Sequence, residues 1–325
     1  MSQIKNIGVY TSGGDSPGMN AAIRAVVRTA LYHDIQVTGI RRGYEGMING
    51  EYEPMNRKSV SNIIQRGGTI LKSARSDEFR TPEGRKLAYF QLKKNKVDAL
   101  VAIGGEGTFT GAKLLGEEYD IPIIGLPGTI DNDLVGTDFT IGYDTAINTV
   151  INAVDKIRDT AESHDRLFIV EVMGRDSGLI ALRSGIASGA EAVLIPESTG
   201  DLNALFHRLE HGRKDKSSRI VIVAEGDQEG GAFEVGRLVK EKFPNYDTRV
   251  SILGHIQRGG RPTCMDRVLA SRVGYAAVEA LKDGHRAEMI GVIHGEISYT
   301  PFEQAIKKNL QLNSNMLKIV EILSL

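Results

Sequence analysis

The chain has 325 residues, and its 40 lysines and arginines nearly balance its 41 aspartates and glutamates. This balance argues against an overall field that attracts nucleic acid or an acidic membrane, although local basic clusters can still bind small anions. Cys264 is the single cysteine, which excludes an intrachain disulfide framework and a cysteine-cluster metal site. The N-terminus lacks a signal-peptide core, and no segment has the roughly 18 uninterrupted apolar residues of a membrane helix, so we expect a cytoplasmic protein.

Short apolar runs alternate with longer amphipathic ones, which is typical of βα units around a mostly parallel sheet. The first unit is a strand at 7–10, a glycine-rich loop and a helix from about Asn20, on which Arg24 and Arg28 share one face. Strands are also expected at 99–103, 121–126, 167–172, 192–195, 220–224, 250–253 and 289–293, and helices at 145–158, 202–211, 235–242 and 266–281. The pattern predicts an α/β fold, and composition places no domain boundary.

Polar or glycine-rich loops follow the first, second and third of these strands, at Thr11–Gly18, Gly104–Thr108 and Pro127–Asp133. In an open α/β sheet, ligands bind at the carboxyl ends of the strands. Glycines let backbone N–H groups approach an anion closely, and a helix N-terminus adds its positive dipole end. The first loop is not a P-loop, because Met19 and Asn20 follow Gly18. Each loop alone could equally be a tight turn.

Three carboxylates lie in these loops. Asp131 and Asp133 point the same way if the backbone is extended, so that one could accept a proton while the other lies near a metal ion. Both could equally be turn or cap residues. Glu106, between glycines, could hold Mg²⁺ directly or through water. Together the loops predict a site for a phosphate-rich ligand, a divalent cation and a hydroxyl to be activated.

Five arginines lie in or beside glycine-containing or strand-end segments: Arg75, Arg166, Arg175, Arg249 and Arg258. A single arginine is usually a solvated charge, but several that converge would bind phosphate through paired hydrogen bonds. His255 lies in a glycine-rich loop, where it could be structural or bind a ligand.

These segments together resemble the bacterial ATP-dependent 6-phosphofructokinases. The matching residues are 11–24, 66–69, 73–75, 127–133, 155–164, 171–175, 195–197, 223–226 and 253–260. The resemblance implies two similar three-layer αβα domains with mostly parallel sheets and the active site in the cleft between them. Residues 1–141 with about 257–307 would form a nucleotide-binding domain, and residues 142–256 with about 308–325 a sugar-phosphate-binding domain.

The resemblance further implies that MgATP phosphorylates fructose 6-phosphate to fructose 1,6-bisphosphate. Asp131 would be the base for the sugar 1-hydroxyl, and Asp133 and Glu106 would organise Mg²⁺. Arg75 and Arg175 would neutralise charge on the transferring phosphoryl group. The family's loop has aspartate where Glu106 stands, so this carboxylate is one methylene longer, and we expect Mg²⁺ use to be retained.

Three sets of binding residues are carried over from the family. The ATP site would comprise Gly14, Arg75, Ser76, Gly105, Glu106, Gly107 and Thr108. The sugar-phosphate site would comprise Thr129, Asp131, Arg166, Met173, Gly174, Arg175, Glu225, Arg249, His255 and Arg258. In the family's homotetramer, the residues that match Arg166 and Arg249 reach across from a neighbouring subunit. A second site, for ADP as activator or phosphoenolpyruvate as inhibitor, would comprise Arg24, Arg28, Arg57, Arg158, Glu191, Lys214 and Lys216.

Several alternatives stay open. Pyrophosphate-dependent phosphofructokinases carry Asp where Gly107 stands and Lys where Gly128 stands, so Gly107 favours ATP. A kinase of another sugar phosphate, such as tagatose 6-phosphate, is compatible with the motifs because pocket shape decides the epimer. Lipid and NAD kinases share only a loop like that around Gly105. A catalytically silent nucleotide-binding subunit conflicts with the retained Asp131 and Asp133, and a Rossmann dehydrogenase lacks its glycine fingerprint.

Overall fold

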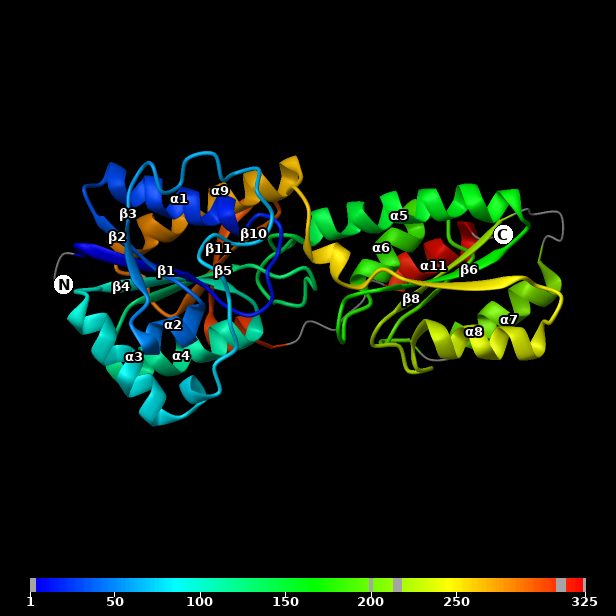
Figure 1. Ribbon diagram of the computed structural model, residues 1–325, viewed down its shortest axis with the longest axis horizontal. Helices are drawn as coiled ribbons and strands as arrows, with labels where there is room; N and C mark the ends of the chain where they lie inside the picture. Colours follow the sequence, from blue (N-terminus) through cyan, green and yellow to red (C-terminus); the bar gives the residue numbers. More distant parts are fainter. Residues whose placement is uncertain (1–3, 199–200, 213–217, 308–313, 324–325) are drawn as a thin grey trace. The chain divides into compact units, whose positions relative to one another are not determined.

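The computed structural model describes residues 4–198, 201–212, 218–307 and 314–323. The chain forms two compact units (Figure 1). The first unit comprises Met1–Ile130, Leu134–Thr145 and Arg258–Asn309, and the second comprises Asp131–Asp133, Ala146–Gln257 and Leu310–Leu325. No helix in the described ranges combines the length and the apolar character that crossing a bilayer requires.

The first unit is built on a sheet for which seven strands are described, in the order β11-β10-β5-β4-β1-β2-β3. The strands from β10 to β2 are parallel, whereas β11 and β3 are antiparallel edges. Because β1 has β2 on one side and β4 on the other, the strand order reverses there. The strands are β1 (Asn6–Thr11), β2 (Gln36–Ile40), β3 (Tyr52–Met55), β4 (Ala99–Gly104), β5 (Ile123–Pro127), β10 (Glu288–Ile293) and β11 (Glu296–Pro301).

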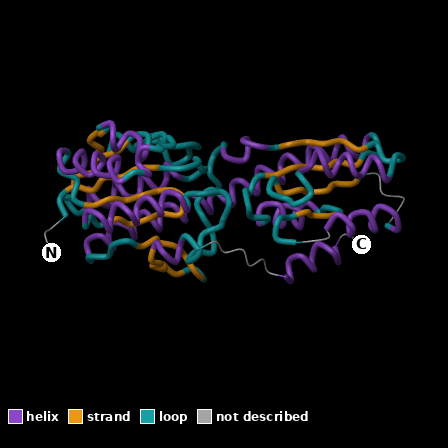
Figure 2. Tube along the Cα trace, turned by 90° about the horizontal axis from the view of Figure 1, so that it is seen from below, coloured by secondary structure: helices purple, strands orange, loops and turns teal. Residues whose placement is uncertain are grey.

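Helices cover both faces of this sheet, which gives the first unit three layers (Figure 1). Helices α1 (Met19–Tyr32) and α9 (Cys264–Lys282) pack together on one face. Their close approach explains Gly274, because a Cβ there would lie 2.7 Å from the Ala25 Cβ. The other face carries α2 (Gly43–Asn49), α3 (Pro82–Lys94), α4 (Glu106–Tyr119) and α10 (Phe302–Ala305). Figure 2 looks onto the sheet, so the helices overlie the strands.

The second unit has a sheet whose described strands are all parallel, in the order β7-β8-β6-β9. Helices α7 and α8 bury their apolar residues against one face. Helices α5, α6 and α11 lie on the other (Figure 1). The elements are α5 (Tyr143–Ser163), β6 (Leu167–Val172), α6 (Leu179–Ser188), β7 (Ala192–Leu194), α7 (Asp201–His211), β8 (Arg219–Ala224), α8 (Gly231–Lys242), β9 (Thr248–Ile252) and α11 (Ser314–Leu323).

The predicted α/β class with two mostly parallel sheets is confirmed. Each strand and helix expected from the alternation is present, within a few residues of its predicted ends. The helix predicted at 145–158 is longer at both ends, because α5 runs from Tyr143 to Ser163. The pattern did not identify the edge strands β3 and β11 or the helices α2, α3, α6, α10 and α11.

Candidate active site

The three loops predicted to form a site begin side by side at the carboxyl edge of the first sheet. Thr11 at the end of β1 is in register with Ile103 in β4, and Gly104 is in register with Pro127 in β5. The strand order reverses between β1 and β4, and ligands of open α/β sheets bind at such a point. The topology therefore brings the predicted phosphate loops together.

The start of α4 is suited to hold an anion. The helix begins at Glu106, and its N-cap residue, Gly105, supplies no side-chain hydrogen bond to the first N–H groups. The first backbone N–H groups of a helix have no partner within it, so those of Glu106, Gly107 and Thr108 point out from the helix end. Such an end binds phosphate through its N–H groups and its dipole. Gly107 is exposed, and a Cβ placed there would meet no atom within 4 Å.

Side chains fix the loops to one another. The Thr108 hydroxyl donates to the Ser12 carbonyl (3.1 Å), and the Ser73 hydroxyl donates to the Gly13 carbonyl (2.5 Å). Asn20 holds the segment that begins at Arg66: its Nδ2 donates to the Arg66 and Gly67 carbonyls, both at 3.1 Å. Both residues lie in segments that match the family, but sequence reasoning assigned neither a role, because their hydrogen-bond partners lie tens of residues away in the chain.

Thr129 lies close to the start of α4. A Cβ added to Gly105 would be 3.5 Å from the Thr129 Cβ, and the Thr129 carbonyl accepts a hydrogen bond from the Thr140 hydroxyl (2.6 Å). Thr129 and Asp131 are 7% and 4% exposed, so both are buried within a loop. Asp131 is therefore not a solvated surface charge.

The other predicted residues of the first unit differ in their surroundings. Arg258 Nη1 lies 3.4 Å from the Asp15 carbonyl oxygen and 2.6 Å from a Cβ added to Gly14. Arg258, which is predicted to bind the sugar phosphate, therefore lies against the loop that is predicted to bind ATP. Arg75 is exposed. The Ser76 hydroxyl accepts a hydrogen bond from the Phe79 N–H (3.3 Å), which gives this residue a structural role at the start of a short 3₁₀ helix.

In the second unit, several predicted residues meet at the carboxyl edge of the sheet. Glu225, which follows β8, accepts hydrogen bonds from the N–H groups of Gly174 (3.3 Å) and Arg175 (2.8 Å), which follow β6. The buried Gln257 accepts from the Met173 N–H (3.3 Å). His255 is exposed in the 3₁₀ turn Gly254–Arg258 after β9. This edge thus presents the side chains of Arg175 and His255 from a fixed backbone.

Arg166 and Arg249 lie at the opposite, amino end of the same sheet. Arg166 precedes β6 and Met173 follows it, a separation of roughly 23 Å along an extended strand. Both arginines bind the Asp247 carboxylate: Arg166 Nε at 2.7 Å and Arg249 Nη2 at 3.0 Å. The Arg166 hydrogen bond, with the charges of Arg249 and Arg166, holds the pKa of Asp247 below its usual value. Within one chain, these two arginines therefore do not lie in the same site as Met173, Gly174 and Glu225.

The predicted effector residues fall into two groups. Arg24 and Arg28 lie on α1, and Arg57 lines a surface hollow with Leu31 of that helix. Partial burial, together with the charge of Arg28, lowers the pKa of Arg24. In the second unit, Arg158 donates to the Ser188 carbonyl, and the Glu191 carbonyl accepts from Arg208 (2.6 Å). Lys214 and Lys216 lie outside the described residues.

The described residues contain no group of three or more His, Cys, Asp or Glu side chains that could bind a metal ion by themselves. Mg²⁺ does not require such a group, because it is usually bound by one or two carboxylates together with water and substrate phosphates. Glu106, in the first turn of α4 beside the outward N–H groups, and Asp133 are hard oxygen ligands of the kind that Mg²⁺ prefers. The residues present therefore fit the ion.

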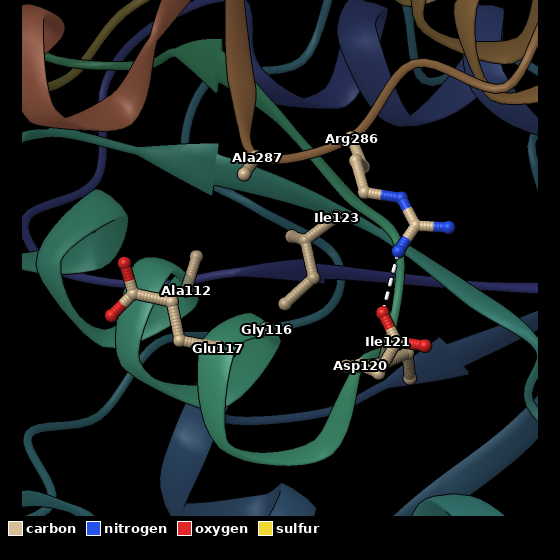
Figure 3. Close-up of a pocket in the computed structure, with 8 residues that line it drawn as sticks. All are labelled: Ala112, Gly116, Glu117, Asp120, Ile121, Ile123, Arg286 and Ala287. Atoms are coloured by element: carbon tan, nitrogen blue, oxygen red, sulfur yellow. Dashed lines mark hydrogen bonds and ion pairs between the residues drawn. The ribbon is translucent and has the colours of Figure 1, made fainter.

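A pocket of about 240 Å³ lies elsewhere, between the end of α4 and the starts of β5 and β10 (Figure 3). An ion pair between Asp120 and Arg286 (Oδ1 to Nη1, 2.5 Å) lies at its side. Ile123 lines it at the amino end of β5, whereas the predicted loops are at the carboxyl end. Small-molecule sites usually measure about 300–1,000 Å³. Neither its place nor its size suits the predicted ligands.

Comparison with known proteins gives consistent matches. Residues 6–281 match the sequence model of the family described as phosphofructokinase. The chain is 58% identical over 322 residues to an ATP-dependent 6-phosphofructokinase of Cytophaga hutchinsonii, covering 99% of this chain and 98% of that protein. It is 56% identical to ATP-dependent 6-phosphofructokinase 2 of Bacteroides thetaiotaomicron, covering all of both.

A solved phosphofructokinase from Saccharomyces cerevisiae is 37% identical, with a TM-score of 0.88; the match covers 98% of this chain and 48% of that one. A pyrophosphate-dependent phosphofructokinase from Marinobacter aquaeolei has a TM-score of 0.85 but only 22% identity, over 98% of this chain and 91% of that one. The second likeness therefore concerns the fold alone.

Proposed function

Because the chain belongs to the phosphofructokinase family, we propose that it transfers the γ-phosphoryl group of ATP to the 1-hydroxyl of fructose 6-phosphate. The products are fructose 1,6-bisphosphate and ADP, and the reaction is the committing step of glycolysis. The names of relatives that match 99% or more of the chain support the reaction. The observation that carries the nucleotide part is the open, uncapped start of α4 at Gly107, beside Thr129 at the carboxyl edge of the sheet.

Asp131 is the proposed general base. It takes the proton from the 1-hydroxyl as that oxygen attacks the γ-phosphorus, and the bond between this phosphorus and the β,γ-bridging oxygen breaks. Phosphoryl transfer depends mainly on positioning and on stabilisation of charge, so the surrounding donors matter as much as the base. Thr129 contributes a hydrogen bond to the transferring group, and Arg75 and Arg175 neutralise its oxygens.

The nucleotide is held by the first unit and the sugar mainly by the second. The N–H groups of Gly105, Glu106, Gly107 and Thr108 bind phosphate oxygens, and Gly14 lets the first loop approach them. Glu106 and Asp133 would hold Mg²⁺, which would supply positive charge to these oxygens when bound. Met173, Gly174, Glu225, His255 and Arg258 surround the sugar phosphate.

Arg166 and Arg249 are proposed to serve the site of a neighbouring subunit in a homotetramer. Their place at the amino end of the second sheet, where Arg166 is about 23 Å from Met173 along β6, supports this assignment, because one chain cannot use both ends of a strand for one small substrate. The Arg24 and Arg28 pair on α1 supports an anionic effector, ADP or phosphoenolpyruvate, since two guanidinium groups four residues apart on one helix face would both attract an anion.

Replacement of Arg166 by serine is expected to raise the KM for fructose 6-phosphate by about 10-fold or more with little change in kcat. Hydrogen bonds to charged groups contribute about 1.5–3 kcal/mol, and each 1.4 kcal/mol is a factor of ten. Arg237→Ser is the matched control, because Arg237 is also paired with carboxylates but lies on the surface of α8. Steady-state kinetics measures both, and an unaltered KM would remove Arg166 from the substrate site.

Mixed assemblies separate the two placements of Arg166. Chains with Asp131→Ser are co-refolded with chains carrying Arg166→Ser. If Arg166 serves a neighbouring subunit, some sites contain an intact Asp131 and an intact Arg166, so activity is recovered. If Arg166 serves its own chain, every site in the mixture carries a lesion, and the activity stays at the sum of the two variants.

The reaction is tested by initial rates of fructose 1,6-bisphosphate formation with Mg²⁺ and either ATP or pyrophosphate as donor. We expect activity with ATP alone. Activity with pyrophosphate would keep the acceptor but overturn the donor. If neither donor gives activity with fructose 6-phosphate but tagatose 6-phosphate is phosphorylated, the proposed acceptor is wrong. If that sugar phosphate is not phosphorylated either, the result favours a subunit that only binds nucleotide.

A further inference from the structure

A buried carboxylate on α9 binds the start of α5. Asp266 is 1% exposed, and Oδ1 accepts a hydrogen bond from the Gly142 N–H at 2.7 Å. Oδ2 accepts from the N–H of Thr145 (2.8 Å) and from its hydroxyl (2.5 Å). A carboxylate in this position satisfies N–H groups at a helix start and interacts favourably with the helix dipole. Asp266 is therefore a cap supplied by a residue that lies 121 positions further along the chain.

Thr263 extends the same network. Its hydroxyl accepts from the Asp266 N–H (3.3 Å) and donates to the Asp144 carboxylate (2.6 Å). Its N–H donates to the Thr145 hydroxyl (3.0 Å). The starts of α5 and α9 are thus bonded to each other. The first unit ends its second segment at Thr145 and begins its third at Arg258, so the network joins the two stretches of chain next to these boundaries.

The segment that Asp266 holds is in turn bonded to the loop after β5. The Thr140 hydroxyl donates to the Thr129 carbonyl (2.6 Å), and the Ile141 N–H donates to the Pro127 carbonyl (2.7 Å). This segment also lies against the first loop, because a Cβ added to Gly142 would be 2.6 Å from the Ser16 Cβ. Residues 140–142 therefore connect Asp266 to two of the three loops at the predicted site.

We propose that Asp266 is a positioning residue for phosphoryl transfer. By fixing residues 140–145, it sets where the Pro127–Thr129 backbone lies relative to the start of α4, and hence where Thr129 and the adjoining Asp131 present their side chains. The assignment rests on the proposed function. A cap that served stability alone would not need bonds onward from Thr140 and Ile141 to the reacting loop.

Asp266→Asn tests the proposal, since it keeps the size of the side chain but replaces an acceptor oxygen by an amide donor facing N–H groups. We expect kcat to fall between about 10-fold and 100-fold, because small displacements of reacting groups cost this much, while the KM for each substrate changes far less. Thr81→Ala is the control: the Thr81 hydroxyl caps α3 in the same unit (from Gly84 N–H, 3.1 Å). It is expected to lower the melting temperature and leave kcat unchanged.

A second variant covers the case in which Asp266→Asn does not fold. Thr140→Val removes the hydroxyl that donates to Thr129 and should lower kcat in the same way, whereas Thr140→Ser retains the hydroxyl and should restore it. The test uses Asp266→Asn if that variant folds, and Thr140→Val if it does not. If the variant used lowers only the melting temperature and leaves kcat unchanged, the positioning role is overturned. An inactive wild type would instead overturn the proposed function, so the wild type is measured first with ATP and fructose 6-phosphate.

Discussion

Replacement of Asp131 by serine is expected to lower kcat by a factor on the order of 10² or more, because general-base catalysis contributes roughly this much. The KM for fructose 6-phosphate should remain close to that of the wild type, since the phosphate and the ring are bound by other residues. Serine is small and polar, so it fits the buried site, where Asp131 is 4% exposed, without leaving a large cavity. Steady-state kinetics in a coupled assay measures both constants.

Asp138→Ser is the control for this substitution. Asp138 lies in the same connection, seven residues further on, and its carboxylate accepts the His294 N–H (2.7 Å) in a purely structural contact. Its replacement should leave kcat unchanged. A full kcat in Asp131→Ser would remove Asp131 as the base. Equal losses in both variants would indicate that disturbance of the loop, and not loss of a base, explains the effect.

Much of the first unit could be predicted from the sequence, because parallel strands impose a shared polarity. Once the runs before Thr11, Gly104 and Pro127 are taken as parallel strands, their following loops must lie at one edge of the sheet. The strand order itself is not encoded in any local pattern. It depends on which helix faces pack together, such as α1 on α9, whose contact needs Gly274 more than 240 residues after Ala25.

The residues that sequence reasoning missed share one physical property: each acts on backbone far away in the chain. Asn20 and Asp266 satisfy backbone N–H or C=O groups of distant loops. Asparagine and acidic side chains at such places look like ordinary turn or cap residues in a single sequence. The separation of Arg166 from Met173, in contrast, can be predicted from the sequence. Arg166 precedes the expected strand and Met173 follows it, so the length of β6 lies between them.

The choice between ATP and pyrophosphate is expected to depend on Gly107. Gly107→Asp should leave the melting temperature unchanged or slightly raised, since the side chain would point into open space and a carboxylate in the first turn of α4 interacts favourably with its dipole. Like charges 4 Å apart repel by about 4 kcal/mol at an effective dielectric constant of about 20. After screening, we expect kcat/KM for ATP to fall by a factor on the order of 10².

Gly107→Asn and Gly107→Ala separate charge from bulk. If repulsion of the nucleotide's phosphate is the cause, asparagine, which has the size of aspartate, should retain most of the activity. If asparagine loses as much as aspartate, the glycine is needed for space. Pyrophosphate activity is not expected to follow from Gly107→Asp alone. The companion lysine would replace Gly128, where a Cβ already lies 3.0 Å from the Met19 Cε and 3.1 Å from the Ile103 Cγ2, so that exchange requires the core beneath the loop to move.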